Sequence, residues 1–68
     1  MITFKLRRLL GSMELSQKDL ANMTGIRPPT ISAICTNKIK ELPVDVMDRI
    51  CNALNCTPAD WILFTKDE

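Results

Sequence analysis

This 68-residue sequence has few side chains that could act as nucleophiles or as general acids and bases, and it has no histidine. Without histidine there is no Ser-His or Cys-His nucleophile pair and no imidazole that titrates near neutral pH. Asp45 and Asp48 lie three residues apart, so a helix would place both carboxylates on one face, as an acid/base pair requires. A solvated helix surface explains that spacing better. We therefore expect no enzymatic activity.

Cysteine is the other reactive residue type, at positions Cys35, Cys51 and Cys56. The three form no C-x-x-C pair, whereas zinc normally takes four ligands in closely spaced pairs, so we expect neither a metal site nor a cofactor. Such a set is typical of small apolar residues in a reducing cytoplasm. Cys35 alone carries a redox hypothesis, because it falls in the segment expected below to face the ligand.

Charge is distributed unevenly, although the net charge is only +1. Residues 1–40 hold seven basic and two acidic side chains, a net +5, whereas residues 41–68 hold two basic and six acidic ones, a net −4. The chain thus joins a basic half to an acidic half. The small total limits nucleic-acid binding without excluding it.

The length allows one domain, residues 1–68, with a small core. Apolar residues make up 46% and charged residues 25% of the chain, a composition typical of a globular protein. Unbroken apolar runs are far too short to span a membrane, and no secretory signal is visible. We expect a cytoplasmic protein with no membrane partner.

Apolar spacing predicts an all-α fold of five helices. Leucines recur at three- and four-residue spacing across Phe4–Met13, as one face of a first helix requires. Ser16 with Asp19 three residues later is an N-terminal capping pattern. A second helix therefore covers Gln17–Thr24 and ends at Gly25, which can adopt left-handed backbone.

Similar signals mark the later helices. The third runs through Thr30–Cys35, with Asn37 as its left-handed terminator. Pro43 suits the first turn of a fourth helix, which Asn55 closes. In Thr57–Asp60 a cap, a proline and an acid start a short fifth helix. Residues 2–4 and 62–65 are β-prone and either pair as a ribbon or pack as chain ends; packing is favoured.

Two short helices joined by a glycine turn, with a small residue at their crossing, describe a helix-turn-helix. Ala21 lets the second helix approach the third, and Gly25 makes the turn. The crossing is fixed by three isoleucines: Ile26, Ile31 and Ile34.

At these residues the chain resembles the Cro/C1 (Xre) family of phage-repressor-like DNA-binding domains. Leu15–Ile26 looks like the family's second helix and turn, and Thr30–Ile34 like its recognition helix. Cys51–Trp61 is similar to the end of its fourth helix and its fifth helix. The resemblance covers nearly the whole chain in the family's order. It implies a five-helix lambda-repressor-like domain with the helix-turn-helix at helices two and three.

The resemblance also implies that helix three enters the major groove of double-stranded operator DNA, while the start of helix two lies on the phosphate backbone. Gln17 would then contact a phosphate. The positions that would face bases or the nearest sugars are Arg27, Pro28, Pro29, Thr30, Ser32 and Ala33. Phosphates beyond the helix would be held by Asn37, Lys38 and Lys40.

The chain departs from the family at the first turn of helix three. Where the family often has long polar residues that read base edges, this chain has Pro28 and Pro29. Proline lacks an N–H group, and Pro29 disfavours helical angles at Pro28, so we expect the helix to start late. Prolines and Ala33 can pack on thymine methyl groups, and Arg27 can reach a guanine or a phosphate. Specificity per half-site should be modest.

A single module of this type reads few base pairs, so such proteins usually bind two half-sites as homodimers. The candidate residues for self-association lie near the C-terminus: Trp61, Leu63 and Phe64. The favoured alternative for Trp61 is that it only closes the small core, which makes Phe64 the better interface residue.

The leading hypothesis is a small regulator that represses transcription by occupying an operator, with no separate effector domain. The alternative is a protein-interaction module, an antitoxin or inhibitor that uses the same fold to bind a protein partner and binds DNA weakly. The double proline and the near-zero net charge favour this alternative more than a strongly basic recognition helix would.

Overall fold

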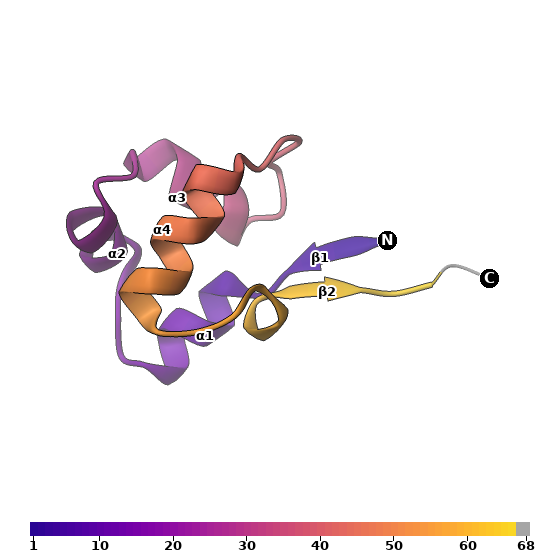
Figure 1. Cartoon of the computed structure of the whole chain (residues 1–68), viewed down its shortest axis with the longest axis horizontal. Coiled ribbons are helices and arrows are strands. Elements are labelled where there is room, and N and C mark those ends of the chain that lie inside the picture. Colours follow the sequence, from indigo (N-terminus) through magenta and orange to yellow (C-terminus); the bar gives the residue numbers. More distant parts are fainter. Residues whose placement is uncertain (67–68) are drawn as a thin grey trace.

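Short helices form a body from which a two-stranded ribbon projects (Figure 1). The structure is a computed structural model that describes residues 1–66. Its elements in chain order are β1 (Ile2–Phe4), α1 (Leu6–Ser12), α2 (Gln17–Thr24), α3 (Pro28–Cys35), α4 (Val44–Leu54), the 3-10 turn η1 (Pro58–Asp60) and β2 (Ile62–Phe64). No helix within residues 1–66 is long and apolar enough to cross a membrane.

One apolar core joins all of the helices. Its buried residues are Leu6, Leu10, Leu20, Ile26, Ile31, Ile34, Cys35, Ile50, Leu54 and Trp61. Trp61 is the largest of these and is fully buried. Its ring lies 6.3 Å from that of Phe4, so the last turn of the chain closes the core beside the first strand. This position agrees with the prediction that Trp61 only closes the small core.

The local signals at both ends of α2 and at the C-terminal end of α4 are confirmed. Asp19 N–H donates to Ser16 Oγ over 3.0 Å, and Ser16 N–H donates to Asp19 Oδ2 over 2.9 Å, which is the predicted capping box. Gly25 ends α2 with a φ of 73°, and Asn55 ends α4 with a φ of 51°. Pro43 precedes α4 as its N-cap rather than lying in its first turn.

The all-α prediction is wrong at the chain ends. β1 and β2 pair antiparallel, with Ile2 opposite Phe64 and Phe4 opposite Ile62, so the first helix begins at Leu6 and not at Phe4. The capping box at Thr57–Asp60 is present, but it closes a single 3-10 turn instead of a fifth helix. The β-prone chain ends therefore pair as a ribbon, and the prediction that favoured simple packing of these ends is wrong.

Asn37 ties the ribbon to the helical body. It has left-handed backbone with a φ of 59°, just beyond α3, as predicted. Its side-chain Oδ1 accepts from Phe4 N–H over 2.6 Å, and its Nδ2 donates to Phe4 C=O over 3.1 Å. The amide therefore pairs with the backbone at the end of β1 much as a neighbouring strand would.

We expect Asn37→Gly to lower the free energy of unfolding by about 1 kcal/mol, because glycine keeps the left-handed backbone but loses both bonds to Phe4. Asn55→Gly is the matched control, since Asn55 adopts the same backbone at the end of α4. It should leave stability unchanged or slightly higher. Urea unfolding followed by circular dichroism measures both, and equal losses would contradict the role given to Asn37.

Candidate nucleic-acid interface

The segment from α2 to α3 has the geometry of a helix-turn-helix (Figure 1). Residues 25–27 connect the two helices, and Gly25 supplies the left-handed residue in the turn. Ile26 follows at once and is only 6% exposed. Ile31 and Ile34 are fully buried, and Ala21 is half-buried against the same core. These residues fix the crossing, as predicted.

The expectation that the third helix starts late is wrong, because α3 begins at Pro28. Arg27 is its N-cap, with extended backbone, and its C=O accepts from Thr30 N–H over 3.0 Å and from Ile31 N–H over 3.3 Å. The N–H groups of a first helical turn have no partner within the helix, so prolines there remove no hydrogen bond. Pro28 and Pro29 thus stiffen the start of α3 rather than delay it.

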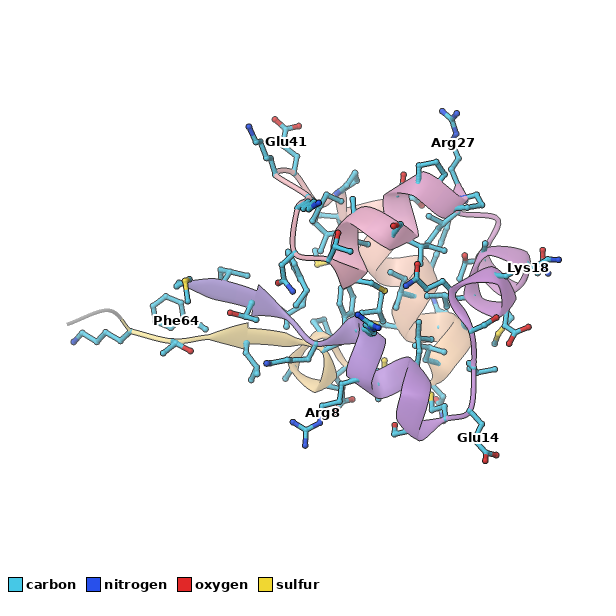
Figure 2. All side chains as sticks on the ribbon, turned by 180° about the vertical axis from the view of Figure 1, so that it is seen from behind. Arg8, Glu14, Lys18, Arg27, Glu41 and Phe64 are labelled. Atoms are coloured by element: carbon cyan, nitrogen blue, oxygen red, sulfur yellow. The ribbon has the colours of Figure 1, made fainter. Side chains whose placement is uncertain are left out.

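The outer face of α3 is uncharged, whereas cations lie beyond both of its ends. Pro28, Pro29 and Ser32 are exposed, and Thr30 and Ala33 are half-buried. Arg27 stands at the N-terminal end and extends into solvent (Figure 2). This face can make apolar contacts and single hydroxyl hydrogen bonds, while charge is available only at its margins.

The connector after α3 carries the second group of predicted cations. Lys38 N–H and Ile39 N–H donate to Ala33 C=O over 2.9 and 3.1 Å, so the backbone here is tied to the end of α3. Lys38 and Lys40 are exposed. Asn37 differs from them, because both ends of its amide are engaged with Phe4.

The start of α2 presents Gln17 at its first helical position, where it is exposed. Hydrogen bonds from Ser16, first from its backbone N–H and then from its hydroxyl, hold the pKa of the Asp19 carboxyl below its ordinary value. Lys18, the next residue, is also exposed and extends into solvent (Figure 2). The sequence predicted no contact for Lys18, although its position directly after Gln17 indicates one.

Cys35 lies on the inner side of α3 and not on its outer face. The side chain is 6% exposed, and burial raises the pKa of its thiol, which a nearby Arg7 partly offsets. A buried thiol with a raised pKa forms little of the reactive thiolate. The position therefore gives no support to the redox hypothesis.

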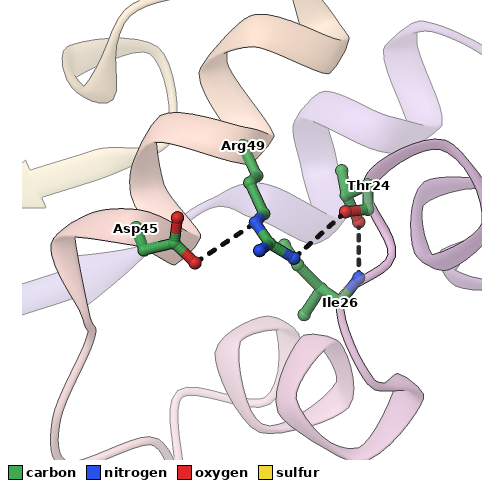
Figure 3. A network of polar contacts seen from close by, with 4 residues as sticks. All are labelled: Thr24, Ile26, Asp45 and Arg49. Atoms are coloured by element: carbon green, nitrogen blue, oxygen red, sulfur yellow. Dashed lines mark hydrogen bonds and ion pairs between the residues drawn. The ribbon is translucent and has the colours of Figure 1, made fainter.

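Arg49 on α4 contacts the end of α2, where the turn to α3 begins (Figure 3). Arg49 Nη1 donates to Thr24 C=O over 3.5 Å, and Arg49 Nε lies 3.2 Å from Asp45 Oδ2. Thr24 Oγ1 accepts from Ile26 N–H over 3.1 Å, inside the turn. Asp45 is thus part of an ion pair that reaches the turn, a contact that no sequence pattern indicated.

The residues proposed for self-association separate into two groups. Trp61 is fully buried, so it offers no surface to a partner. Leu63 is 45% and Phe64 70% exposed on β2, and Ile2, opposite Phe64, is 53% exposed. Figure 2 shows Phe64 on the ribbon, at the other end of the molecule from Arg27 and Lys18.

Comparison with known proteins also identifies a helix-turn-helix domain. A family profile of Cro/C1-type HTH DNA-binding domains matches residues 5–67. The chain is also 28% identical over 60 residues, 88% of its length and 71% of the relative's, to an uncharacterized HTH-type transcriptional regulator, YozG, of Bacillus subtilis (strain 168). No solved structure matches it.

Proposed function

Because the chain belongs to the family of Cro/C1-type HTH DNA-binding domains, we propose that it is a sequence-specific transcriptional regulator of the cytoplasm that represses by occupying an operator. The observation that best supports this function is the face of α3, which is exposed and uncharged between cations at both ends. A helix of this kind can enter the major groove while its margins hold the phosphate backbone.

The contacts proposed for each residue follow from its place around α3 or at the start of α2. Phosphates are contacted by Gln17, Lys38 and Lys40, and Lys18 joins them because it is exposed directly after Gln17. Arg27 reaches a guanine edge, for which a guanidinium has the matching donors. The uncharged face then contacts thymine methyls and single polar edges, through Pro28, Pro29, Thr30, Ser32 and Ala33. Asn37 supports the fold and is not assigned a phosphate.

An anisotropy titration tests this function. The protein is titrated onto a duplex taken from the DNA upstream of its own gene and onto a random duplex of equal length, each at two salt concentrations. We expect tighter binding to the upstream duplex and a logarithmic salt slope of about −0.9 for every phosphate contacted. Equal binding to both duplexes would instead favour the alternative of a protein-interaction module, an antitoxin or inhibitor, which the uncharged face of α3 also suits.

Arg27 and Lys38 should respond differently to removal. Arg27→Ala should cost roughly 1–3 kcal/mol on the upstream duplex and less on random DNA, because a base contact is lost. Lys38→Ala should weaken both duplexes similarly and reduce the salt slope by about 1, since only a phosphate contact is lost. The same titrations measure both variants. Equal losses on the two duplexes for Arg27→Ala would rule out its base contact.

Two copies of the chain should associate through the ribbon. The apolar side chains exposed there are Met1, Ile2, Leu63 and Phe64. The ribbon leaves the helical body away from Arg27, so a dimer joined through it keeps both α3 helices accessible (Figure 2). Two linked modules can then occupy two half-sites about one helical turn apart.

Phe64→Ser should raise the dimer dissociation constant at least about tenfold, because an isologous interface loses the aromatic ring from both copies. Val44→Ser is the matched control, since Val44 is 75% exposed at the start of α4, outside the ribbon. Light scattering and native mass spectrometry report the oligomeric state. A wild-type monomer at high micromolar concentration would exclude the homodimer.

A further inference from the structure

Arg49 lies at the point where α4 meets the turn of the helix-turn-helix (Figure 3). Its guanidinium donates to the C=O of Thr24, the last residue of α2, and lies 3.8 Å from the place where a Cβ on Gly25 would be. The ion pair with Asp45, one helical turn earlier on α4, holds the guanidinium in this direction. The side chain therefore spans from α4 to the turn, with 48% of its surface still exposed.

A cation near the C-terminal end of α2 stabilises that helix. The last carbonyl groups of a helix have no partner within the helix and carry partial negative charge, which a cation stabilises. The last turn of α2 contains no basic residue of its own. Arg49 supplies the missing cation from another element, at a carbonyl directly followed by the left-handed Gly25.

The same carbonyl belongs to the residue that organises the turn. Thr24 Oγ1 donates to Leu20 C=O over 2.7 Å and accepts from Ile26 N–H over 3.1 Å. A displacement of Thr24 would thus be passed to Ile26, whose side chain is in the core just before α3 begins. Thr24 thus connects the last turn of α2 to the residue that precedes the start of α3.

We propose that Arg49, oriented by Asp45, is a positioning residue that sets the crossing of α2 and α3 and thereby makes base recognition selective. The effect on recognition rests on the proposed function; the effect on the turn does not. Arg49 acts without touching DNA, because its charge is already paired with Asp45 and its contact is with the protein backbone.

Reading base edges needs α3 at one depth and angle, whereas phosphate contacts tolerate small shifts. A turn that samples several crossings lowers the fraction of protein competent for selective binding, and the apparent affinity falls with that fraction. The loss should therefore be larger on selected DNA than on scrambled DNA.

The test uses the full chain and two duplexes: one selected from a random library by the wild-type protein, and one with the same bases scrambled. Arg49→Met should weaken binding to the selected duplex roughly threefold to tenfold and to the scrambled duplex less than about twofold, with an unchanged salt slope. Arg49→Lys should recover most of this loss because it restores the cation at Thr24, and Asp45→Asn should give an intermediate loss. All titrations are run at a temperature well below the thermal unfolding midpoint of every variant.

Two matched controls separate the proposal from a general effect of charge. Arg8→Met removes the same charge from α1, where Arg8 extends from a different side of the helical body than Arg27 (Figure 2), and Asp48→Asn repeats the Asp45 change elsewhere on α4. Both should leave the ratio of selected to scrambled affinity unchanged. Equal losses on both duplexes with a salt slope reduced by about 1 would make Arg49 a phosphate ligand and overturn the proposal. An unchanged ratio with only a lower unfolding midpoint would also overturn it.

Amide hydrogen exchange tests the turn without DNA. In Arg49→Met the amides of Gly25 and Ile26, which donate to Ala21 C=O and Thr24 Oγ1, should exchange several-fold faster, while the amide of Leu10 in α1 keeps its wild-type rate. Unchanged exchange at Gly25 and Ile26 would overturn the positioning role. If the wild-type protein selects no duplex, the proposed function fails, and exchange alone decides whether Arg49 positions the turn.

Discussion

The short connection between α2 and α3 is the constraint on which the rest of the structure depends. Only residues 25–27 join the two helices, and they combine a left-handed Gly25, a buried Ile26 and an extended Arg27. A connection this short leaves little slack, so a change in the crossing of the helices displaces Ile26 within the core. The core is small, and the orientation of the proposed recognition helix is therefore tied to the stability of the fold.

Features set by contacts within four residues were predictable from the sequence. The Ser16–Asp19 box and the left-handed Gly25 and Asn55 belong to this class, because a cap is satisfied by its own helix. The double proline was misjudged on two counts. The missing N–H groups cost nothing in a first helical turn, and the preference of a residue before proline for extended backbone did not keep Pro28 out of α3. The caps that were predicted correctly and the start of α3 that was not are all decided by the backbone of neighbouring residues.

Features that join distant segments were predicted poorly: the ribbon was only the less favoured of two alternatives, and the side-chain contacts below were not predicted at all. The ribbon pairs the two ends of the chain, Asn37 bonds to Phe4 across 33 residues, and Arg49 reaches Thr24 across 25 residues. No spacing pattern encodes such contacts. For the candidate site, the family resemblance pointed to α3 and its margins, but nothing in the sequence indicated that the Asn37 side chain bonds to Phe4 in β1.

The ribbon has a consequence for the order in which the chain folds. Pairing Ile2 with Phe64 closes a loop of about sixty residues, whereas the helices form from neighbours in the sequence. Loop-closure entropy makes such distant pairing slow and late, and local helical contacts precede it. We therefore expect the strand pair to complete the fold after the helices have met. The exposed apolar side chains of the chain ends come together only then, so the homodimer proposed above would form only between molecules that are already folded.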